Sequence, residues 1–164
     1  MGINVRLGVV VMRDIEIYTD GAARGNPGPS ASGFLVLDDG RSLIEHSRYN
    51  GIATNNAAEY TAIIMALEWS EAHIGNHAGA EMRLFSDSEL VVRQLVGSYR
   101  VKSAGLRALN ERALGLIGHF KALSLHNVPR SNPYVSRVDH NLNILLDSMR
   151  GRGDVKPSTA VGLP

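Results

Sequence analysis

The chain carries the alternating segment IEIYTDG at residues 15–21, in which apolar and polar side chains follow one another with a period of two. Such alternation predicts a β-strand with one face in the core, and the terminal Asp-Gly pair favours a turn. A second apolar run, GFLVL at residues 33–37, is followed by Asp-Asp-Gly, which is typical of a tight hairpin. Residues 42–49 supply a third expected strand. The first part of the chain therefore predicts an antiparallel meander.

Helical and extended patterns alternate in the rest of the chain. Residues 57–73 are rich in Ala, Leu, Glu and Ile, and the residues in front of them are of the types that cap helices. Glycine and proline place residues 21–29, and the segment between Pro129 and Pro133, in loops. The order predicts an α/β fold, a mixed five-stranded sheet of three antiparallel and then two parallel strands with helices on both faces. The further expected helices are 88–96, 106–120 and 138–149, and the further expected strands are 81–86 and 122–128.

Length and composition bound the organisation of the chain. Its 164 residues fit one domain, which we expect over residues 14–149. Residues 1–13 form an N-terminal extension, for which an extra edge strand, an unordered leader and a wrongly assigned start all stay open. Residues 150–164 contain Gly, Pro, Ser and Thr without periodicity and are expected to form a disordered tail. No apolar run approaches the roughly 20 residues of a membrane span, which predicts a soluble cytoplasmic protein.

Residue counts exclude several chemistries. The chain has no Cys, which excludes disulfide frameworks, thiolate metal sites and cysteine nucleophiles. Its 17 Lys and Arg against 16 Asp and Glu give a net charge of +1. Taken alone, that balance argues against a protein that holds nucleic acid mainly through a basic surface.

Four acidic residues stand at the ends of predicted elements. Asp20 ends the first strand and Asp87 ends the fourth, so parallel pairing of these strands would bring both carboxylates to one edge of the sheet. Glu59 lies on the same helical face as Ile63, which points it toward the core. Asp139 opens the last expected helix and faces inward by the same argument.

Such a group of carboxylates fits hard divalent cations. Taken singly, each of the four has an ordinary structural explanation as a turn residue, a helix cap or a first-turn acid. Converging together without His or Cys, they suit Mg²⁺ or Mn²⁺, whose charge would offset their mutual repulsion. Two ions of this kind activate a water molecule and stabilise the leaving oxygen in phosphodiester cleavage.

Three sequence motifs give a family resemblance. The segments IYTDGAARGNPGP at residues 17–29, TNNAAE at 54–59 and SDSELVVRQL at 86–95 resemble ribonuclease H of type 1, in the compact branch often called archaeal-type. Residues 128–130 (VPR) and 138–139 (VD) resemble the fourth motif of that family, together with Asn143. The resemblance covers roughly residues 15–147 and implies a ribonuclease H-like fold. It also implies an endonuclease that cuts the RNA strand of an RNA–DNA hybrid.

The resemblance also assigns roles to residues of the site. It implies that two Mg²⁺ ions, with Mn²⁺ as an alternative, are held by four catalytic carboxylates, namely Asp20, Glu59, Asp87 and Asp139. A second group resembles the residues that contact the hybrid, and it comprises Gly21, Asn26, Asn55, Asn56 and Arg130. Asn carries both a donor and an acceptor for a 2′-hydroxyl, and Gly lets backbone approach a nucleic-acid strand closely. Arg130 stands where the better-known branch has a Gly-His pair, and we expect it to assist phosphate binding or product release.

Several alternatives stay open at this point. Asn55 or Asn56 could simply cap the helix that follows them. The long linker at residues 131–138 makes Asp147 the alternative to Asp139 as the fourth metal ligand. The substrate could instead be double-stranded RNA or a DNA junction, or the chain could be a non-catalytic hybrid-binding module. Residues 97–106 lack the basic protrusion of other branches, which predicts a modest and strongly salt-dependent affinity for the hybrid. We also expect a monomer without an obligate protein partner.

Overall fold

The computed structural model describes residues 12–74, 79–150 and 152. Residues 1–11 of the expected N-terminal extension lie outside this part of the chain, as do residues 151 and 153–164 of the expected tail. The described elements, in chain order, are β1 (Arg13–Ala23), β2 (Gly28–Asp38), β3 (Arg41–Ala53), α1 (Asn55–His73), β4 (Ala80–Ser86), α2 (Glu89–Leu95), α3 (Ala104–Ile117), β5 (Leu123–Asn127) and α4 (Pro133–Arg150).

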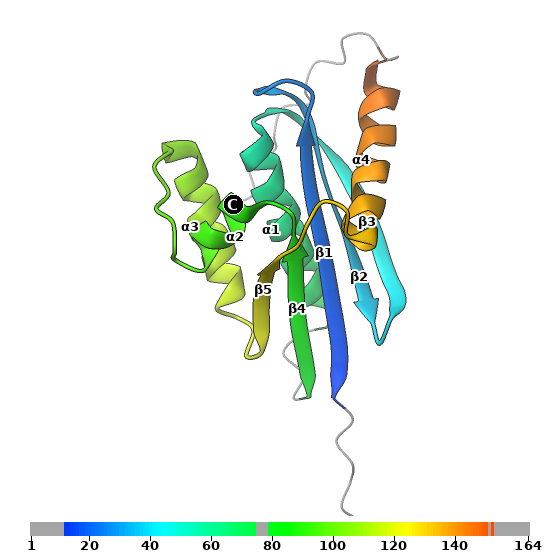
Figure 1. Cartoon of the computed structure of the whole chain (residues 1–164), viewed down its shortest axis with the longest axis vertical. Helices are drawn as coiled ribbons and strands as arrows, with labels where there is room; N and C mark the ends of the chain where they lie inside the picture. The colour runs from blue at the N-terminus through cyan, green and yellow to red at the C-terminus, as the bar shows by residue number, and fades with distance from the viewer. Residues whose placement is uncertain (1–11, 75–78, 151, 153–164) are drawn as a thin grey trace, which may run out of the picture.

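The five strands form one mixed sheet in the order β3-β2-β1-β4-β5. The meander β1-β2-β3 is antiparallel, and β4 and β5 run parallel to β1. Helices α1, α2 and α3 lie on one face of this sheet, and α4 lies on the other (Figure 1). The predicted fold class is therefore confirmed. Among the described residues, no helix combines the length and the apolarity that a bilayer-spanning segment needs.

Alternating side chains of the central strands pack into two separate hydrophobic cores, one on each face of the sheet. Ile15 and Ile17 of β1 face α1 and are fully buried there, whereas Tyr18 faces α4. Helix α1 buries the face that carries Glu59 and Ile63, as the sequence predicted, together with Leu67, because it covers the middle of the sheet. Amphipathic α4 contributes a narrower stripe on the opposite face, which comprises Val135, Val138, Leu142 and Leu146. The central strand β1 is thus enclosed on both faces, and its carboxyl end is held rigidly.

The first hairpin is longer than the sequence predicted. The expected loop at residues 21–29 shrinks because the pairing of β1 with β2 continues through Gly21 and Ala22 to the pair Ala23 and Ser30. Backbone hydrogen bonding thus outweighs the glycine and proline content of this segment. The second hairpin agrees with its Asp-Asp-Gly pattern, since Asp39 and Gly40 form a two-residue turn with positive φ values of 48° and 78°.

The last helix begins earlier than the sequence predicted. Pro133 is its first residue, because proline lacks an N–H that an opening turn leaves unpaired in any case. The side chain of Asn132 caps this end, accepting hydrogen bonds from the backbone N–H groups of Tyr134 (3.0 Å) and Val135 (3.2 Å). The expectation of a loop up to residue 137 was therefore wrong, and Asp139 lies beyond the first turn of α4 instead of opening it.

Candidate active site

Three of the predicted carboxylates meet at the carboxyl end of the central strands. Asp20 lies on β1 and Asp87 directly follows β4, and the parallel register that pairs Thr19 with Ser86 brings these two ends together. Glu59 reaches the same point from α1. One carboxylate oxygen of each of the three residues lies within 4.8 Å of those of the other two. The structure therefore brings together Asp20, Glu59 and Asp87, as their positions in the sequence led us to expect.

Glu59 is held there by close packing of α1 on β1. The backbone N–H of Gly21 donates a hydrogen bond to the Glu59 carboxylate. A Cβ atom at position 21 would lie 2.3 Å from both the carbonyl carbon of Ala58 and the backbone nitrogen of Glu59. Glycine is thus required at this position by the helix packed on it. The sequence interpretation gave Gly21 a contact with substrate, and that role stays a prediction beside this internal one.

Two oxygens of this group lack a partner within the described residues. Asp20 and Glu59 are only 1% and 5% exposed, and their Oδ2 and Oε2 atoms are buried without a hydrogen bond. A buried carboxylate oxygen without a partner is costly, and a cation is the usual compensation. Hard, anionic oxygen donors are those that Mg²⁺ and Mn²⁺ prefer. The donor set therefore fits a divalent cation.

Burial and mutual repulsion change the acidity of all three groups. Burial, with the charges of Asp87 and Asp139, raises the pKa of Asp20 to about 8. Burial and the charges of Asp20 and Asp87 raise the pKa of Glu59 well above its ordinary value. Burial also raises the pKa of Asp87, although the nearby guanidinium of Arg130 opposes this. Without metal the group therefore retains protons near neutral pH, and a bound cation would displace them.

The metal-free protein is expected to lose unfolding free energy as the pH rises through about 8, the pKa of Asp20. A carboxyl group with a higher pKa in the folded than in the unfolded chain stabilises the fold below its unfolded pKa. That contribution is lost as the pH rises through the folded pKa. Saturating Mg²⁺ is expected to remove the decline, because the cation replaces the protons. Thermal unfolding between about pH 5 and about pH 9, with and without Mg²⁺, measures both effects.

Asp20→Asn is the control variant for this measurement, because the amide does not titrate. The difference between the wild-type and variant unfolding curves isolates the contribution of Asp20 from that of every other carboxylate. An identical pH slope in the two metal-free proteins would contradict the assignment of a raised pKa to Asp20.

Asp139 lies beside the three-carboxylate group, although it is not one of the residues whose oxygens all lie within 4.8 Å of one another. Its charge contributes to the raised pKa values of Asp20 and Asp87. The guanidinium of Arg130 lies between these acids, 3.9 Å from an oxygen of Asp87 and 3.7 Å from one of Asp139. Asp147, by contrast, is exposed and forms a 3.0 Å ion pair with Arg24. The structure thus places Asp139, and not Asp147, next to the group.

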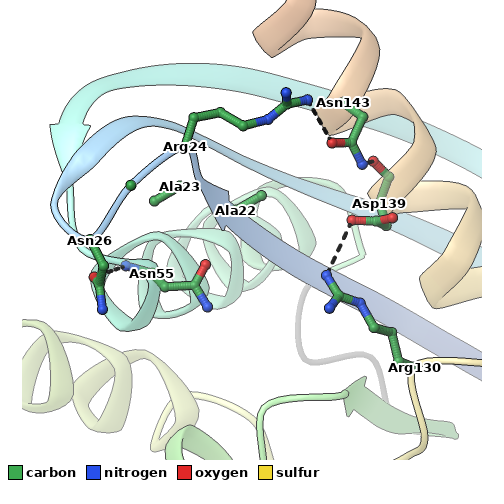
Figure 2. Close-up of a pocket in the computed structure, with 9 residues that line it drawn as sticks. Ala22, Ala23, Arg24, Asn26, Asn55, Arg130, Asp139 and Asn143 are labelled. Atoms are coloured by element: carbon green, nitrogen blue, oxygen red, sulfur yellow. Dashed lines mark hydrogen bonds and ion pairs between the residues drawn. The ribbon is translucent and has the colours of Figure 1, made fainter.

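A pocket of about 500 Å³ opens beside Asp139, and most of the residues predicted to contact substrate line it (Figure 2). Asn26 and Asn55 lie on one side of it, where the Asn26 Oδ1 atom accepts a 3.0 Å hydrogen bond from the backbone N–H of Asn55. Arg130 lies on the other side and its side chain is 76% exposed. Asn56 is half-buried and is not among the residues that line this pocket.

The helix-capping alternative for Asn55 and Asn56 was wrong. Thr54 is the cap, because its hydroxyl accepts the hydrogen bond of the Ala57 backbone N–H at 3.2 Å. The side chains of both asparagines are therefore not needed to begin α1.

Arg24 is a residue of this pocket that the sequence interpretation missed. Its guanidinium donates a 2.8 Å hydrogen bond to Asn143 Oδ1 and also pairs with Asp147, so it ties the β1–β2 connection to α4 (Figure 2). Asn143 in turn donates to the backbone carbonyl of Asp139 at 3.0 Å. The sequence did offer one signal, because Arg24 is a cation inside a glycine- and proline-rich segment. Nothing in the sequence, however, indicated that Arg24 contacts Asn143 and Asp147, which lie more than a hundred positions away.

Comparison with known sequences shows one family over most of the chain. The model of the family described as RNase H matches residues 12–114. Ribonuclease HI of Halobacterium salinarum is 41% identical over 134 residues, which cover 81% of this chain and 64% of that protein. A bifunctional protein of Mycobacterium tuberculosis is 36% identical over 127 residues, covering 76% of this chain and 34% of that protein. The chain thus spans 64% and 34% of these curated relatives.

Solved structures give the same result, and nearly the full length of each is matched by this chain. The crystal structure of RNase H1 from Halobacterium salinarum is 39% identical, with a TM-score of 0.75, over 82% of this chain and 98% of that one. LC11-RNase H1, crystallised in complex with an RNA/DNA hybrid, is 37% identical with a TM-score of 0.76, over 83% of this chain and 99% of that one.

Proposed function

This chain belongs to the ribonuclease H family, and from that premise we propose that it is an endoribonuclease that hydrolyses the RNA strand of RNA–DNA hybrids. One observation carries the proposal beyond family membership. Asp20, Glu59 and Asp87 converge from separate elements and leave two buried oxygens without a partner, an arrangement that suits a metal-dependent nuclease. A non-catalytic binding module would not need this costly group, so the observation favours the enzyme.

The proposed cofactor is a pair of Mg²⁺ ions, with Mn²⁺ as the alternative, held by Asp20, Glu59, Asp87 and Asp139. When bound, such ions activate the attacking water and stabilise the leaving oxygen of the phosphodiester. The chain's own residues bring Asp20, Glu59 and Asp87 together, with Asp139 beside them, and exclude bulk water from Asp20 and Glu59. Burial that raises the pKa of Asp20 and Glu59 in the empty site also strengthens their attraction to a cation.

The proposed substrate contacts lie around the neighbouring pocket. Asn26 and Asn55 would recognise 2′-hydroxyl groups, together with Asn56 and the backbone of Gly21, because amides and N–H groups match a hydroxyl that both donates and accepts. Arg130 is mostly exposed, which leaves its guanidinium able to reach a phosphate. We further place the protein in the cytoplasm as a monomer, with residues 14–149 forming the catalytic domain.

A substrate panel tests the proposal directly. Labelled RNA–DNA hybrid, RNA duplex, DNA duplex and a four-way DNA junction are incubated with the protein and Mg²⁺ or Mn²⁺. We expect internal cleavage of the RNA strand of the hybrid alone. Cleavage of the RNA duplex or the junction in preference to the hybrid would assign the site to another nuclease class. Hybrid binding without cleavage under either metal would favour the binding module.

Asp139→Asn is expected to lower kcat on the hybrid by about 10- to 100-fold, whereas Asp147→Asn is expected to leave kcat within about twofold of wild type. The two substitutions remove the same charge from the same helix, but only Asp139 lies beside the metal-binding carboxylates. Steady-state cleavage at saturating Mg²⁺ measures the difference. The reverse order of effects would make Asp147 the fourth ligand.

A further inference from the structure

We propose that Ser32 and Asn50 form a positioning pair that fixes the first turns of α1, and with them Glu59, against the sheet. The inference rests on the function proposed above, because it takes Glu59 as a metal ligand. Ser32 lies on β2 and is 0% exposed. Its hydroxyl donates a 2.6 Å hydrogen bond to the backbone carbonyl of Ala58, the residue directly before Glu59.

Asn50 directs the Ser32 hydroxyl toward that carbonyl. The amide Nδ2 of Asn50 donates to Ser32 Oγ at 2.7 Å. Because a carbonyl can only accept, the single proton of Ser32 must go to Ala58 O, and its oxygen is left to accept from an amide. The Oδ1 atom of Asn50 is buried and has no hydrogen-bond partner within the described residues. The one side-chain hydrogen bond that orients Asn50 there is therefore the bond to Ser32.

A local irregularity of β3 brings Asn50 into reach. Ser30 of β2 pairs with Gly51, but the next residue, Ala31, pairs with Tyr49, so Asn50 is an extra residue in β3. Gly51 has a positive φ of 81°, which a bulge of this kind accommodates easily. Bulges turn a side chain away from its regular direction, and here that change lets Asn50 meet Ser32. A regular strand would not supply this contact.

The hydrogen bond from Ser32 to Ala58 lies next to the point where Glu59 packs on the sheet. Ser32 is the direct partner of Gly21 in the pairing of β2 with β1. Gly21 donates its N–H to the Glu59 carboxylate, while Ser32 donates to the carbonyl of Ala58. Two donors on neighbouring strands thus hold consecutive residues of α1, one through the backbone carbonyl of Ala58 and the other through the side chain of Glu59. They fix the rotation of the helix about its axis, which sets the direction of the Glu59 side chain.

Ser30 provides a matched control on the same strand. It is also 0% exposed, and its hydroxyl donates a 3.1 Å hydrogen bond to the carbonyl of Gly51 on β3. Removing the Ser30 hydroxyl deletes one hydrogen bond, whereas removing the Ser32 hydroxyl deletes two, so Ser32→Ala is expected to cost more stability than Ser30→Ala. Only the bond of Ser32 ends on α1. A purely structural role for Ser32 therefore predicts that any loss of Mg²⁺ affinity in the two variants follows their loss of stability.

The experiment compares Ser32→Ala, Asn50→Ala and Ser30→Ala with the wild type in two assays. Calorimetric titration with Mg²⁺ in the absence of substrate gives metal affinity, and steady-state cleavage of the hybrid gives kcat and KM. We expect Ser32→Ala to weaken Mg²⁺ affinity roughly tenfold and to lower kcat with KM unchanged. Asn50→Ala should act in the same direction but less strongly. Ser30→Ala should keep wild-type metal affinity although it also loses a hydrogen bond and some thermal stability.

The two proposals fail in different ways in this experiment. Wild-type Mg²⁺ affinity in Ser32→Ala, or an equal loss in Ser32→Ala and Ser30→Ala, would overturn the positioning role even if the wild type cleaves hybrids. A wild type that binds Mg²⁺ but cuts no hybrid would overturn the proposed function, while a selective effect of Ser32→Ala would still support the positioning role. Absence of any Mg²⁺ binding by the wild type would overturn both. Should Ser32→Ala not fold, wild-type affinity in Asn50→Ala would overturn the positioning role.

Discussion

Asp20→Asn is expected to abolish cleavage of the hybrid, with kcat lowered by about 10³-fold or more. Asp20 lies at the centre of the acidic group, where its pKa responds to Glu59, Asp87 and Asp139 together. In the proposed site, losing its charge removes one metal ligand, and metal ions contribute several kcal/mol to the transition state of such reactions. Cleavage at saturating Mg²⁺ measures the loss.

The same substitution should not harm the fold. Removing a buried, repelled carboxylate is expected to raise the unfolding temperature of the metal-free protein at about pH 9, where Asp20 is otherwise charged. Asp39→Asn is the matched control, because Asp39 is an exposed turn residue whose positive φ of 48° suits Asn equally well. Asp39→Asn should keep full activity. Full activity in Asp20→Asn, or comparable losses in both variants, would refute the metal-dependent mechanism.

Gly21→Ala is expected to lower the free energy of unfolding by about 3 kcal/mol and kcat by about 100-fold. The added Cβ would lie 2.3 Å from the backbone of α1, at Ala58 and Glu59. A backbone cannot change rotamer to avoid this clash, so α1 must move away from β1. That movement carries Glu59 out of the group and disturbs its hydrogen bond with the N–H of position 21. Denaturant unfolding and cleavage kinetics measure the two losses.

Gly115→Ala is the matched control for that substitution. Gly115 lies within α3, and a Cβ there would meet nothing within 4 Å. Alanine has the higher helix propensity, so this variant is expected to gain roughly 0.5 to 1 kcal/mol of stability and to keep its activity. Unchanged stability and kcat in Gly21→Ala would show that α1 tolerates displacement and that the close packing is not required.

The overall fold was predictable because its determinants are local. Alternation in the first strands, the apolar stripe of α1 and the two-residue turn at Asp39 and Gly40 each specify an element within a few residues. The order of these elements then leaves few topologies for a mixed sheet. The positions of Asp20 and Asp87 followed for the same reason, since parallel neighbours place their carboxyl ends together.

The errors arose where tertiary context overrides composition. The segment after Asp20 looks like a loop because it is rich in glycine and proline, yet pairing with β2 extends it to Ala23. Pro133 was taken as a loop residue, although a preceding Asn and a proline are also typical of a helix start. Recognising that pattern would have placed Asp139 within the helix.

Other parts of the site depend on contacts that no local pattern encodes. The need for glycine at position 21 comes from α1 packing over it, and the role of Ser32 comes from a carbonyl on that same helix. Arg24 reaches α4 at the far end of the chain. Each of these contacts joins residues whose sequence separation carries no periodic signal. They become visible only when the layers of the fold are assembled.

The three-carboxylate group and the neighbouring Asp139 come from β1, α1, the end of β4 and α4, which together span nearly the whole described chain. During synthesis the first three of these elements leave the ribosome before α4, so a nascent chain cannot present all four carboxylates. The position of Glu59 also depends on Gly21 of β1 and Ser32 of β2, which are paired in the sheet. The proposed nuclease activity would therefore appear only at the end of folding. An incompletely synthesised chain would not cleave RNA–DNA hybrids.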